Sequence, residues 1–253
     1  MADLWQATWC GVLMDGTPDA NGCVWNLEII EGWDSAEVRA PRTNRTAGHG
    51  TWGPRRLFGG RPLIAKGWVD APDMAAAFDA RDELHSLTDG TVVVHESVEK
   101  QIDVVHDGEI RSSDPIDTGG KTWFRFEIPV VAPYPFKRAT SPVTVSVPAA
   151  STVVHSAAGT AAAEIEVTTT SSGTLSLDIG GLVLSAWLPP NGTVLTSGPG
   201  FTNLPRTVVG PGGADEYGRV NPGAQWPAMS PGSNDLVNGG TASFDVTYYP
   251  TYA

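Results

Sequence analysis

The sequence KTWFRFEIPVV, residues 121–131, decides the fold class of this chain. Apolar and polar side chains alternate along it, and its large apolar members include Trp123, Phe124 and Phe126. A period of two residues is typical of a β-strand that buries one face. Three further runs also predict strands, at residues 23–31, 61–69 and 91–98. The first half of the chain is therefore expected to be built mainly from β-strands.

The composition supports a β-rich protein and limits what it can bind. The chain has 253 residues, of which 29 are Gly and 20 are Pro, and only 17% are charged. A helical bundle would favour Ala, Glu, Lys and Leu instead. Hydrophobic residues make up 41%, which is too many for a disordered acidic tail, and the net charge is −12. Such acidity argues against general nucleic-acid binding, because phosphate contacts need a basic face.

Residues 72–88 carry the one clear helical pattern. Pro72 suits the first helical turn, and Asp73 complements the helix dipole there. Asp89-Gly90 follows and can end the helix. Apolar and long side chains recur at spacings of three and four on one side, which we expect to pack against a sheet: Met74, Ala77, Phe78, Arg81, Leu84 and Leu87. Phe78, Leu84 and Trp123 are predicted core residues.

The composition changes near residue 139, and we place a domain boundary there. Residues 139–253 contain only Arg206 and Arg219 as basic residues, and they are rich in Thr, Ser, Gly and Pro. Pro133 and Pro135 precede the change, and two prolines so close together cannot continue a sheet ladder. The sequence therefore predicts two domains, residues 1–138 and residues 139–253, joined at this proline segment.

The sequence of the second domain predicts short strands separated by turns. Asn191-Gly192 is typical of a two-residue hairpin turn, because both residues tolerate positive φ. No helical pattern interrupts the segment, so a β-sandwich is the expected architecture. The predicted strands are residues 143–147, 164–169, 174–179, 182–187, 193–197, 207–209 and 241–249.

Residues 39–69 form a basic segment with no acidic residue, which is unusual in so acidic a chain. Seven Gly and Pro residues lie between residues 48 and 62 of it. Arginine suits contacts with carboxylates because its planar fork binds them in bidentate fashion. We expect an arm that lies on an acidic neighbouring subunit, with a solvated hairpin or nucleic-acid contact as alternatives. The predicted contact residues are Arg39, Arg42, Arg45, Arg55, Arg56 and Arg61.

No catalytic, cofactor or metal motif stands out in the sequence. There is no GxSxG or HExxH, and Gly119-Gly120-Lys121-Thr122 lacks the earlier glycine of a phosphate-binding loop. Cys10 and Cys23 alone make neither a zinc site nor a disulfide framework. No apolar run has the roughly 20 residues of a membrane helix, and the N-terminus lacks a signal-peptide pattern. We expect a protein that is not an enzyme, needs no cofactor or metal, contacts no membrane and folds in a cytoplasm.

The order of features resembles the distal tail proteins of long-tailed (siphovirus) bacteriophages. GWDSAEVR at residues 32–39 leads to the basic segment, FGGRP at residues 58–62 and IAKG at residues 64–67. An Ala-rich helix, charged strands, an aromatic strand and VVAPYP at residues 130–135 follow. In the second half, LPPNG at residues 188–192 and WPAMSPGSN at residues 226–234 resemble the C-terminal region of that family. Gly232-Ser233-Asn234 fits a turn before its last strand.

The resemblance implies a mainly β (α+β) fold and a structural role. The N-terminal domain would be a tail-tube-like split β-barrel with one flanking helix, and the C-terminal domain a galectin-like β-sandwich. Six copies would form a ring that joins the tail-tube protein to the hub of the tail tip and baseplate. Its central channel would pass DNA in transit, and side or receptor-binding proteins are further expected partners. The protein would be assembled in the bacterial cytoplasm and reside at the tail tip of the virion.

Three other functions remain open from the sequence. A carbohydrate-binding tail module would stack sugar rings on exposed aromatics of the second domain, for which the candidates are Trp187, Trp226, Tyr248 and Tyr249. The same aromatics could instead fill the core of the sandwich. A tail-associated peptidoglycan hydrolase lacks a recognisable nucleophile or zinc motif. A tail-tube protein would share the first domain, but the second domain and the basic segment favour the distal position.

Overall fold

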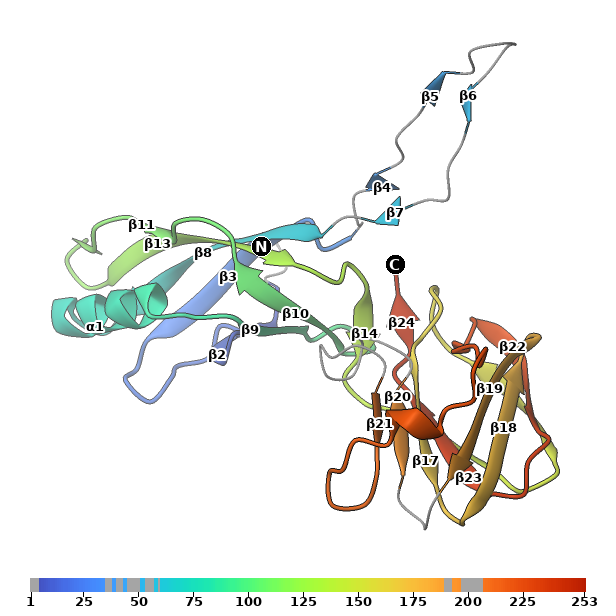
Figure 1. The fold of residues 1–253 in the computed structure, drawn as a ribbon. Coiled ribbons are helices and arrows are strands. Elements are labelled where there is room, and N and C mark those ends of the chain that lie inside the picture. The colour runs from blue at the N-terminus through green and yellow to red at the C-terminus, as the bar shows by residue number, and fades with distance from the viewer. Residues whose placement is uncertain are drawn as a thin grey trace. The chain divides into compact units, whose positions relative to one another are not determined.

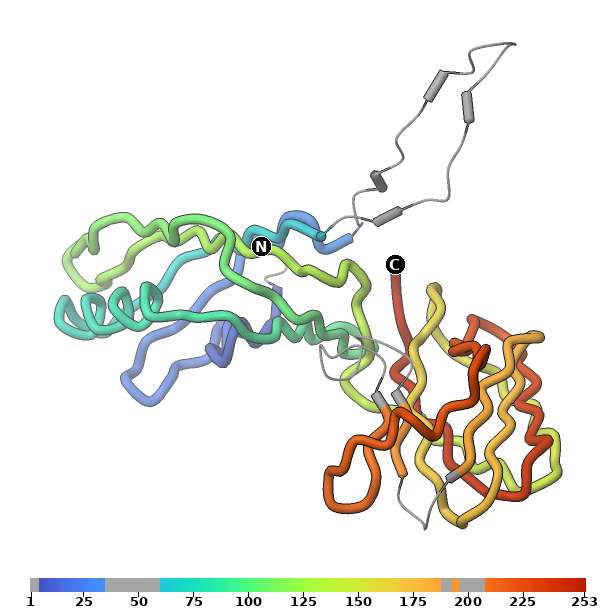
Figure 2. Tube along the Cα trace, in the orientation of Figure 1, coloured from blue at the N-terminus to red at the C-terminus, as the bar shows by residue number. Residues whose placement is uncertain are grey.

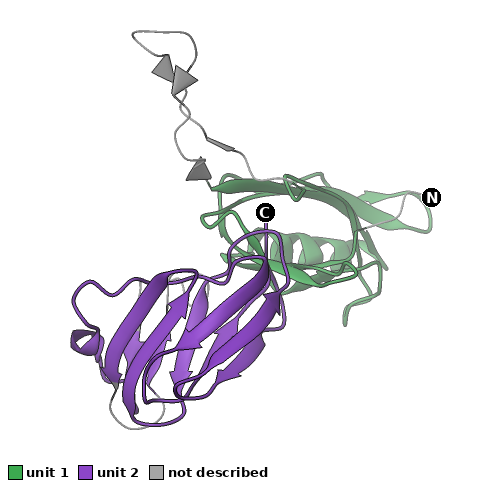
Figure 3. Ribbon diagram, turned by 90° about the vertical axis from the view of Figure 1, so that its right-hand side faces the viewer, with its two compact units in different colours: residues 1–137, 253 green, residues 138–252 purple. Residues whose placement is uncertain are grey.

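The computed structural model describes residues 5–34, 60–188, 193–196 and 207–253. It also gives the backbone of four two-residue strands that pair as β4 with β7 and β5 with β6: β4 (Val38–Arg39), β5 (Thr43–Asn44), β6 (Thr51–Trp52) and β7 (Leu57–Phe58). The chain divides into two compact units, Met1–Lys137 with Ala253, and Arg138–Tyr252 (Figure 3). Figure 2 traces the described chain through each unit in turn.

Unit 1 is built on one long, open sheet with the strand order β2-β1-β9-β10-β13-β8-β3 (Figure 1). The strands are β1 (Ala7–Trp9), β2 (Val12–Met14), β3 (Val24–Glu31), β8 (Arg61–Ala71), β9 (Gly90–Val94), β10 (Lys100–His106) and β13 (Thr122–Ala132), and the short β11 (Arg111–Ser112) and β12 (Ile116–Asp117) pair with β13. The path does not close into a barrel. The predicted mainly-β class is confirmed.

The central strand β13 shows the alternation that its sequence predicts. Phe124 and Phe126 are buried, and they face the core with the apolar residues of β8. Trp123 is only half-buried, because neighbouring residues of a strand point to opposite faces of the sheet. The prediction that Trp123 belongs to the core was therefore wrong in a way that the strand geometry explains.

The helix α1 (Met74–His85) packs against β8 and β13 and covers one face of the sheet (Figure 1). Asp73 caps it, since its Oδ1 accepts a hydrogen bond of 2.8 Å from the Ala76 amide. Its buried residues are Ala77, Ala80 and Leu84. Phe78 is 48% exposed, so the prediction that it lies in the core was wrong. Among the described residues no helix is long and apolar enough to cross a membrane.

Unit 2 is a sandwich of two antiparallel sheets with its core between them. One sheet has the order β15-β23-β17-β20-β21 and the other β16-β22-β18-β19. The bounds are β15 (Val143–Val147), β16 (Thr152–Ala157), β17 (Ile165–Thr169), β18 (Gly173–Ile179), β19 (Leu182–Leu188), β20 (Val194–Thr196), β21 (Thr207–Val209), β22 (Gly232–Asn238) and β23 (Phe244–Tyr248). Two short strands, β14 (Lys137–Ala139) and β24 (Thr251–Tyr252), pair with each other.

Two strands of the sandwich, β16 and β22, were not predicted. Gly232-Ser233-Asn234, which was expected to form a turn, begins β22 and pairs with β16. The Asn234 side chain is nevertheless tied to the preceding loop, because its Nδ2 donates to the Ser230 carbonyl at 2.7 Å. The predicted turn at Asn191-Gly192 lies outside the described residues.

Candidate interaction sites

Five residues of unit 1 form a polar cluster, which we call the Trp33 cluster: Trp33, Arg61, Glu96, Lys100 and Lys137. Trp33, Arg61 and Lys137 are buried, whereas Glu96 and Lys100 are partly exposed. Trp33 follows β3, Arg61 begins β8, and Lys137 begins β14. Glu96 and Lys100 lie at the connection between β9 and β10. Residues from four distant parts of the sequence thus meet around Trp33.

Gly32 allows the chain to bring Trp33 into this position. Its φ is +83°, a region that favours glycine. A Cβ atom at residue 32 would lie 2.2 Å from the Pro62 carbonyl oxygen, which is too close for any side chain. The chain therefore turns directly against the start of β8, and the Trp33 ring is fully buried.

Two buried cations share the backbone carbonyl of Trp33. Arg61 Nη1 donates to it at 3.1 Å, and Lys137 Nζ donates to it at 2.8 Å. The ammonium group of Lys137 also lies 5.0 Å from the centre of the Trp33 ring, within the range of a cation–π interaction. Arg61 has no exposed surface and Lys137 is 5% exposed. Burial of two like charges side by side is costly unless they are well paired.

The acidic member of the cluster is already engaged. Trp33 Nε1 donates to Glu96 Oε1 at 2.7 Å, and Lys100 Nζ donates to Glu96 Oε2 at 2.5 Å. Burial opposes ionisation of Glu96, but these two hydrogen bonds outweigh it and hold its pKa below the ordinary 4.5. Glu96 therefore remains a carboxylate at neutral pH, and both of its oxygens are occupied.

The two buried cations are electrostatically strained. Burial lowers the pKa of Lys137, and the positive charge of Arg61 lowers it further. Burial likewise lowers the pKa of Arg61, which the Asp34 carboxylate partly offsets. Arg61 Nε and Nη2 are buried and find no hydrogen-bond acceptor among the described residues. The cluster thus leaves one edge of a guanidinium unpaired.

Of the six arginines predicted to contact a neighbouring subunit, the structure describes the side chain of one. Arg61 lies in the Trp33 cluster, enclosed within unit 1. The side chains of the other five lie outside the described residues: Arg39, Arg42, Arg45, Arg55 and Arg56. Their contact role stays a prediction.

The four aromatic candidates for sugar stacking have different surroundings in unit 2. Trp187 is 57% exposed, and Arg219 Cζ lies 5.1 Å from the centre of its ring. Trp226 is half-buried and stacks on Tyr217 at 6.5 Å. Residues of the short 3₁₀ helix η1 (Tyr217–Arg219) thus contact both tryptophans. Trp187 presents the largest exposed aromatic surface of the four.

The two tyrosine candidates are less available. Tyr248 is buried, and its hydroxyl is hydrogen-bonded to His155 Nε2 at 2.8 Å. Tyr249 is half-buried, with Arg138 Cζ 5.9 Å from its ring centre. A sugar ring needs an exposed aromatic face, so Tyr248 cannot provide a stacking surface in this fold.

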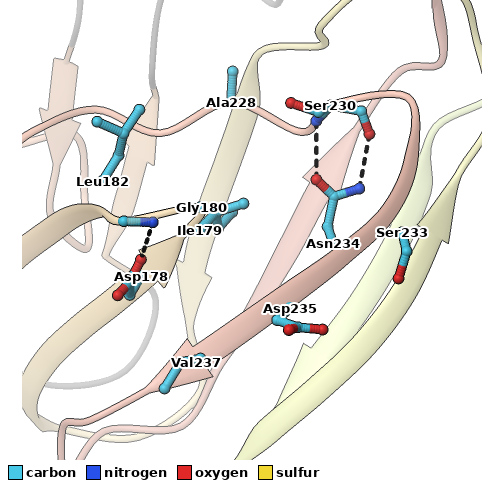
Figure 4. A pocket seen from close by; sticks show the side chains of 11 residues that line it. Asp178, Ile179, Gly180, Leu182, Ala228, Ser230, Ser233, Asn234, Asp235 and Val237 are labelled. Atoms are coloured by element: carbon cyan, nitrogen blue, oxygen red, sulfur yellow. Dashed lines mark hydrogen bonds between the residues drawn. The ribbon is translucent and has the colours of Figure 1, made fainter.

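A pocket of about 600 Å³ with a mixed polar and apolar lining opens between the β18–β19 turn and β22 (Figure 4). Asp178 and Asp235 contribute carboxylates, and Ser230 and Ser233 contribute hydroxyls. Asp178 Oδ1 accepts from the Gly181 amide at 2.8 Å, and Asn234 is held by Ser230. No sequence motif pointed to this pocket. Within the described part of the chain, His, Cys, Asp and Glu nowhere gather in threes that could hold a metal ion.

The fold has counterparts among solved phage structures. The crystal structure of SPP1 Dit, described as a hub of the adsorption apparatus in phages that infect Gram-positive bacteria, has a TM-score of 0.67 and 12% identity, covering 98% of this chain and 99% of that one. The baseplate of phage P2 in its activated conformation with Ca has a TM-score of 0.51 and 8% identity, covering 98% of each chain. The same baseplate with Sr has a TM-score of 0.51 and 7% identity, covering 96% and 97%.

No family model matches this sequence, and no curated protein matches it either. The structural likeness nevertheless extends over nearly the whole of both chains, so it covers both units and not one common domain. The chain therefore has the two-unit fold of SPP1 Dit.

Proposed function

We propose that this chain is a structural protein of a phage virion, a hexameric ring adaptor that joins the tail tube to the tail tip or baseplate hub. The observation that carries the proposal is the match to SPP1 Dit over 98% of this chain and 99% of that one. The likeness to the phage P2 baseplate supports the same position in the particle. In this proposal the ring leaves a central channel for DNA and acts without catalysis or a cofactor.

The uneven charge of the chain supports self-association. A cyclic ring needs two different patches on each subunit that complement each other. The basic segment of residues 39–69 supplies one such patch, and the remainder of a chain with net charge −12 supplies acidic surface. The proposed contact residues are Arg39, Arg42, Arg45, Arg55, Arg56 and Arg61. The tail-tube protein, the hub protein and receptor-binding proteins are the proposed partners within the tail.

Sedimentation of the purified chain in rising salt tests the ring. We expect a mass six times that of the monomer at low salt, falling as salt screens the contacts. Arg55→Glu combined with Arg56→Glu should shift the mass towards the monomer at the same protein concentration, while Arg125→Glu serves as a control on the sheet of unit 1. A monomer at every salt concentration would contradict the proposed ring.

A second function, binding of host glycans, is favoured by one observation. Trp187 is 57% exposed in unit 2, and the Arg219 guanidinium, which lies over its ring, adds hydrogen-bond donors next to it. An aromatic ring can stack on the apolar face of a sugar, while a neighbouring polar group forms hydrogen bonds with the sugar hydroxyls. Binding of the full chain to host cell walls, and its loss in Trp187→Ala, would support this function. Equal binding by both proteins would exclude Trp187 as its site.

A further inference from the structure

The unpaired edge of Arg61 has the geometry of a carboxylate receptor. Nη1 is used by the Trp33 carbonyl, which leaves Nε and Nη2 as the two buried donors without an acceptor among the described residues. These two N–H groups lie on the same side of the planar guanidinium and point in parallel. A carboxylate accepts such a pair through both of its oxygens. A buried donor without an acceptor destabilises the folded protein. A ligand that accepts hydrogen bonds from both Nε and Nη2 therefore removes a large part of this destabilisation.

The net positive charge of the cluster also favours binding of an anion. Arg61 and Lys137 meet at one carbonyl, and Glu96 gives both of its oxygens to Trp33 and Lys100. Asp34 is near enough to raise the pKa of Arg61, yet its side chain is exposed and makes no hydrogen bond to the guanidinium. No described carboxylate of the chain itself therefore occupies the free edge of Arg61.

We propose that the Trp33 cluster is a binding site for a carboxylate group, which a neighbouring subunit supplies when the chain assembles. The carboxylate would bind Arg61 Nε and Nη2 and lie close to the ammonium group of Lys137. The cluster contains Trp33, which precedes the basic segment, and Arg61, which lies within it. The identity of the donor as a subunit rests on the proposed ring, whereas the recognition of a carboxylate does not.

The acidity of the chain favours a neighbouring copy as the donor. Each copy carries 28 Asp and Glu residues against 16 Lys and Arg residues, so carboxylates are abundant on any partner surface. A carboxylate that enters a site with two buried cations loses its hydration but gains charge-assisted hydrogen bonds in return. Since Arg61 has no exposed surface in the isolated chain, entry needs a local opening, and binding is expected to be slow.

The first experiment tests carboxylate recognition in the wild-type full chain. Sodium formate replaces sodium chloride at constant ionic strength, and the Nε–H signal of Arg61 is followed by ¹H–¹⁵N correlation after assignment through its own side chain. We expect a saturable downfield shift of the Arg61 proton and a rise in the melting temperature with formate. Arg111, an exposed arginine of the same unit, should shift without saturation. If the Arg61 signal does not respond, the site does not take carboxylates and the proposal is wrong.

The second experiment identifies the source of the carboxylate. If a neighbouring subunit supplies it, formate competes with assembly, and the protein concentration needed for half-assembly should rise at least tenfold over that in chloride. Arg61→Lys keeps the charge but loses the paired donors, so its assembly should be weak and insensitive to formate, while Arg111→Lys should behave as wild type. Lys137→Gln provides a second variant in case Arg61→Lys does not fold.

The two experiments test carboxylate recognition and the source of the carboxylate independently of each other. Saturable formate binding with unchanged assembly would mean that a free carboxylate is the ligand, which overturns the neighbouring subunit as its source. Absence of any assembly would contradict the proposed ring and also remove the subunit as donor, while formate binding to Arg61 would still stand. A Tm rise of equal size in wild type and Arg61→Lys would place the bound anion elsewhere and overturn the site.

Discussion

Trp33 Nε1 donates a 2.7 Å hydrogen bond to Glu96 Oε1, although the two residues lie 63 positions apart in the chain. The bond connects the end of β3 with the β9–β10 connection, and it fixes the ring that carries Lys137 on its face. Trp33, which precedes the basic segment, is therefore held by several contacts with remote parts of the sequence.

Trp33→Phe removes this donor from a fully buried ring. Because a hydrogen bond to a charged acceptor is lost and the smaller ring leaves a gap, we expect unit 1 to lose about 1–3 kcal/mol of unfolding free energy. Urea unfolding followed by circular dichroism measures it. Trp187→Phe, at an exposed ring, is the matched control and should change stability by less than about 0.5 kcal/mol. Equal losses in the two variants would contradict the structural role of Trp33.

The carboxylate of Glu96 predicts a specific pH dependence. Its folded-state pKa lies below the ordinary 4.5, so the unfolded chain binds the proton more readily than the folded chain. The contribution of Glu96 is therefore fully present above about pH 4.5 and is lost as the pH falls through the lowered folded-state pKa. We expect the stability difference between wild type and Glu96→Gln to shrink over this range in urea titrations. The exposed Glu109→Gln is the control, and an unchanged difference down to the most acid pH would refute the assignment.

The helix α1 offers a pair of residues whose burial differs sharply. Leu84→Ala should cost about 2–5 kcal/mol, because Leu84 is fully buried between α1 and the sheet. Phe78→Ala should cost less, about 1 kcal/mol, since 48% of its surface is already exposed. Thermal and urea unfolding of both variants test this order. A larger loss for Phe78→Ala than for Leu84→Ala would support the sequence-based prediction that Phe78 lies in the core.

Gly67 marks a close approach of β3 to β8. A Cβ atom there would lie 2.0 Å from the Asn26 carbonyl oxygen and 2.8 Å from Phe126 Cζ. Gly67→Ala must therefore push the two strands apart, at a cost of about 1–3 kcal/mol or more. Gly218→Ala meets no atom within 4 Å and serves as the control. Wild-type stability of Gly67→Ala would show that β3 does not pack in this register.

Both thiols should be unreactive in the folded protein. Burial, and then the charge of Asp89, raises the pKa of Cys10 to about 11, and burial also raises that of Cys23 to about 11. At pH 8 only about one thiol in a thousand is then ionised, and the thiolate is the reactive form. A colorimetric disulfide reagent should label both cysteines slowly in buffer and rapidly in urea. Rapid labelling in buffer would contradict this packing.

The sequence predicted strands with a regular period correctly. It did not always predict which face of a strand or helix is buried. The alternation in residues 121–131 predicted β13, and residues 143–147 matched β15, because a half-buried strand needs a period of two. Trp123 and Phe124 could not both face the core for the same reason. In α1 small alanines form the buried face, because they let the helix approach the sheet closely, and apolar size alone had favoured Phe78.

The candidate site was largely hidden from sequence reasoning. Arg61 was predicted only as one of six contact arginines in the basic segment, and nothing in the sequence singled out Lys137. Their meeting at the Trp33 carbonyl depends on pairing between strands that are remote in sequence, which no local pattern reports. Gly32, whose positive φ places Trp33 in the cluster, lies within the motif that carried the family resemblance, but the sequence did not predict its turn.

The position of this chain in a phage particle tests the proposed function most directly. Virions that contain the chain can be labelled with gold-conjugated antibodies against it and imaged by negative-stain electron microscopy. A ring adaptor predicts label confined to the distal end of the tail, next to the tip. Label along the whole tail would instead identify a tube protein, and particles without label would contradict a role in the virion.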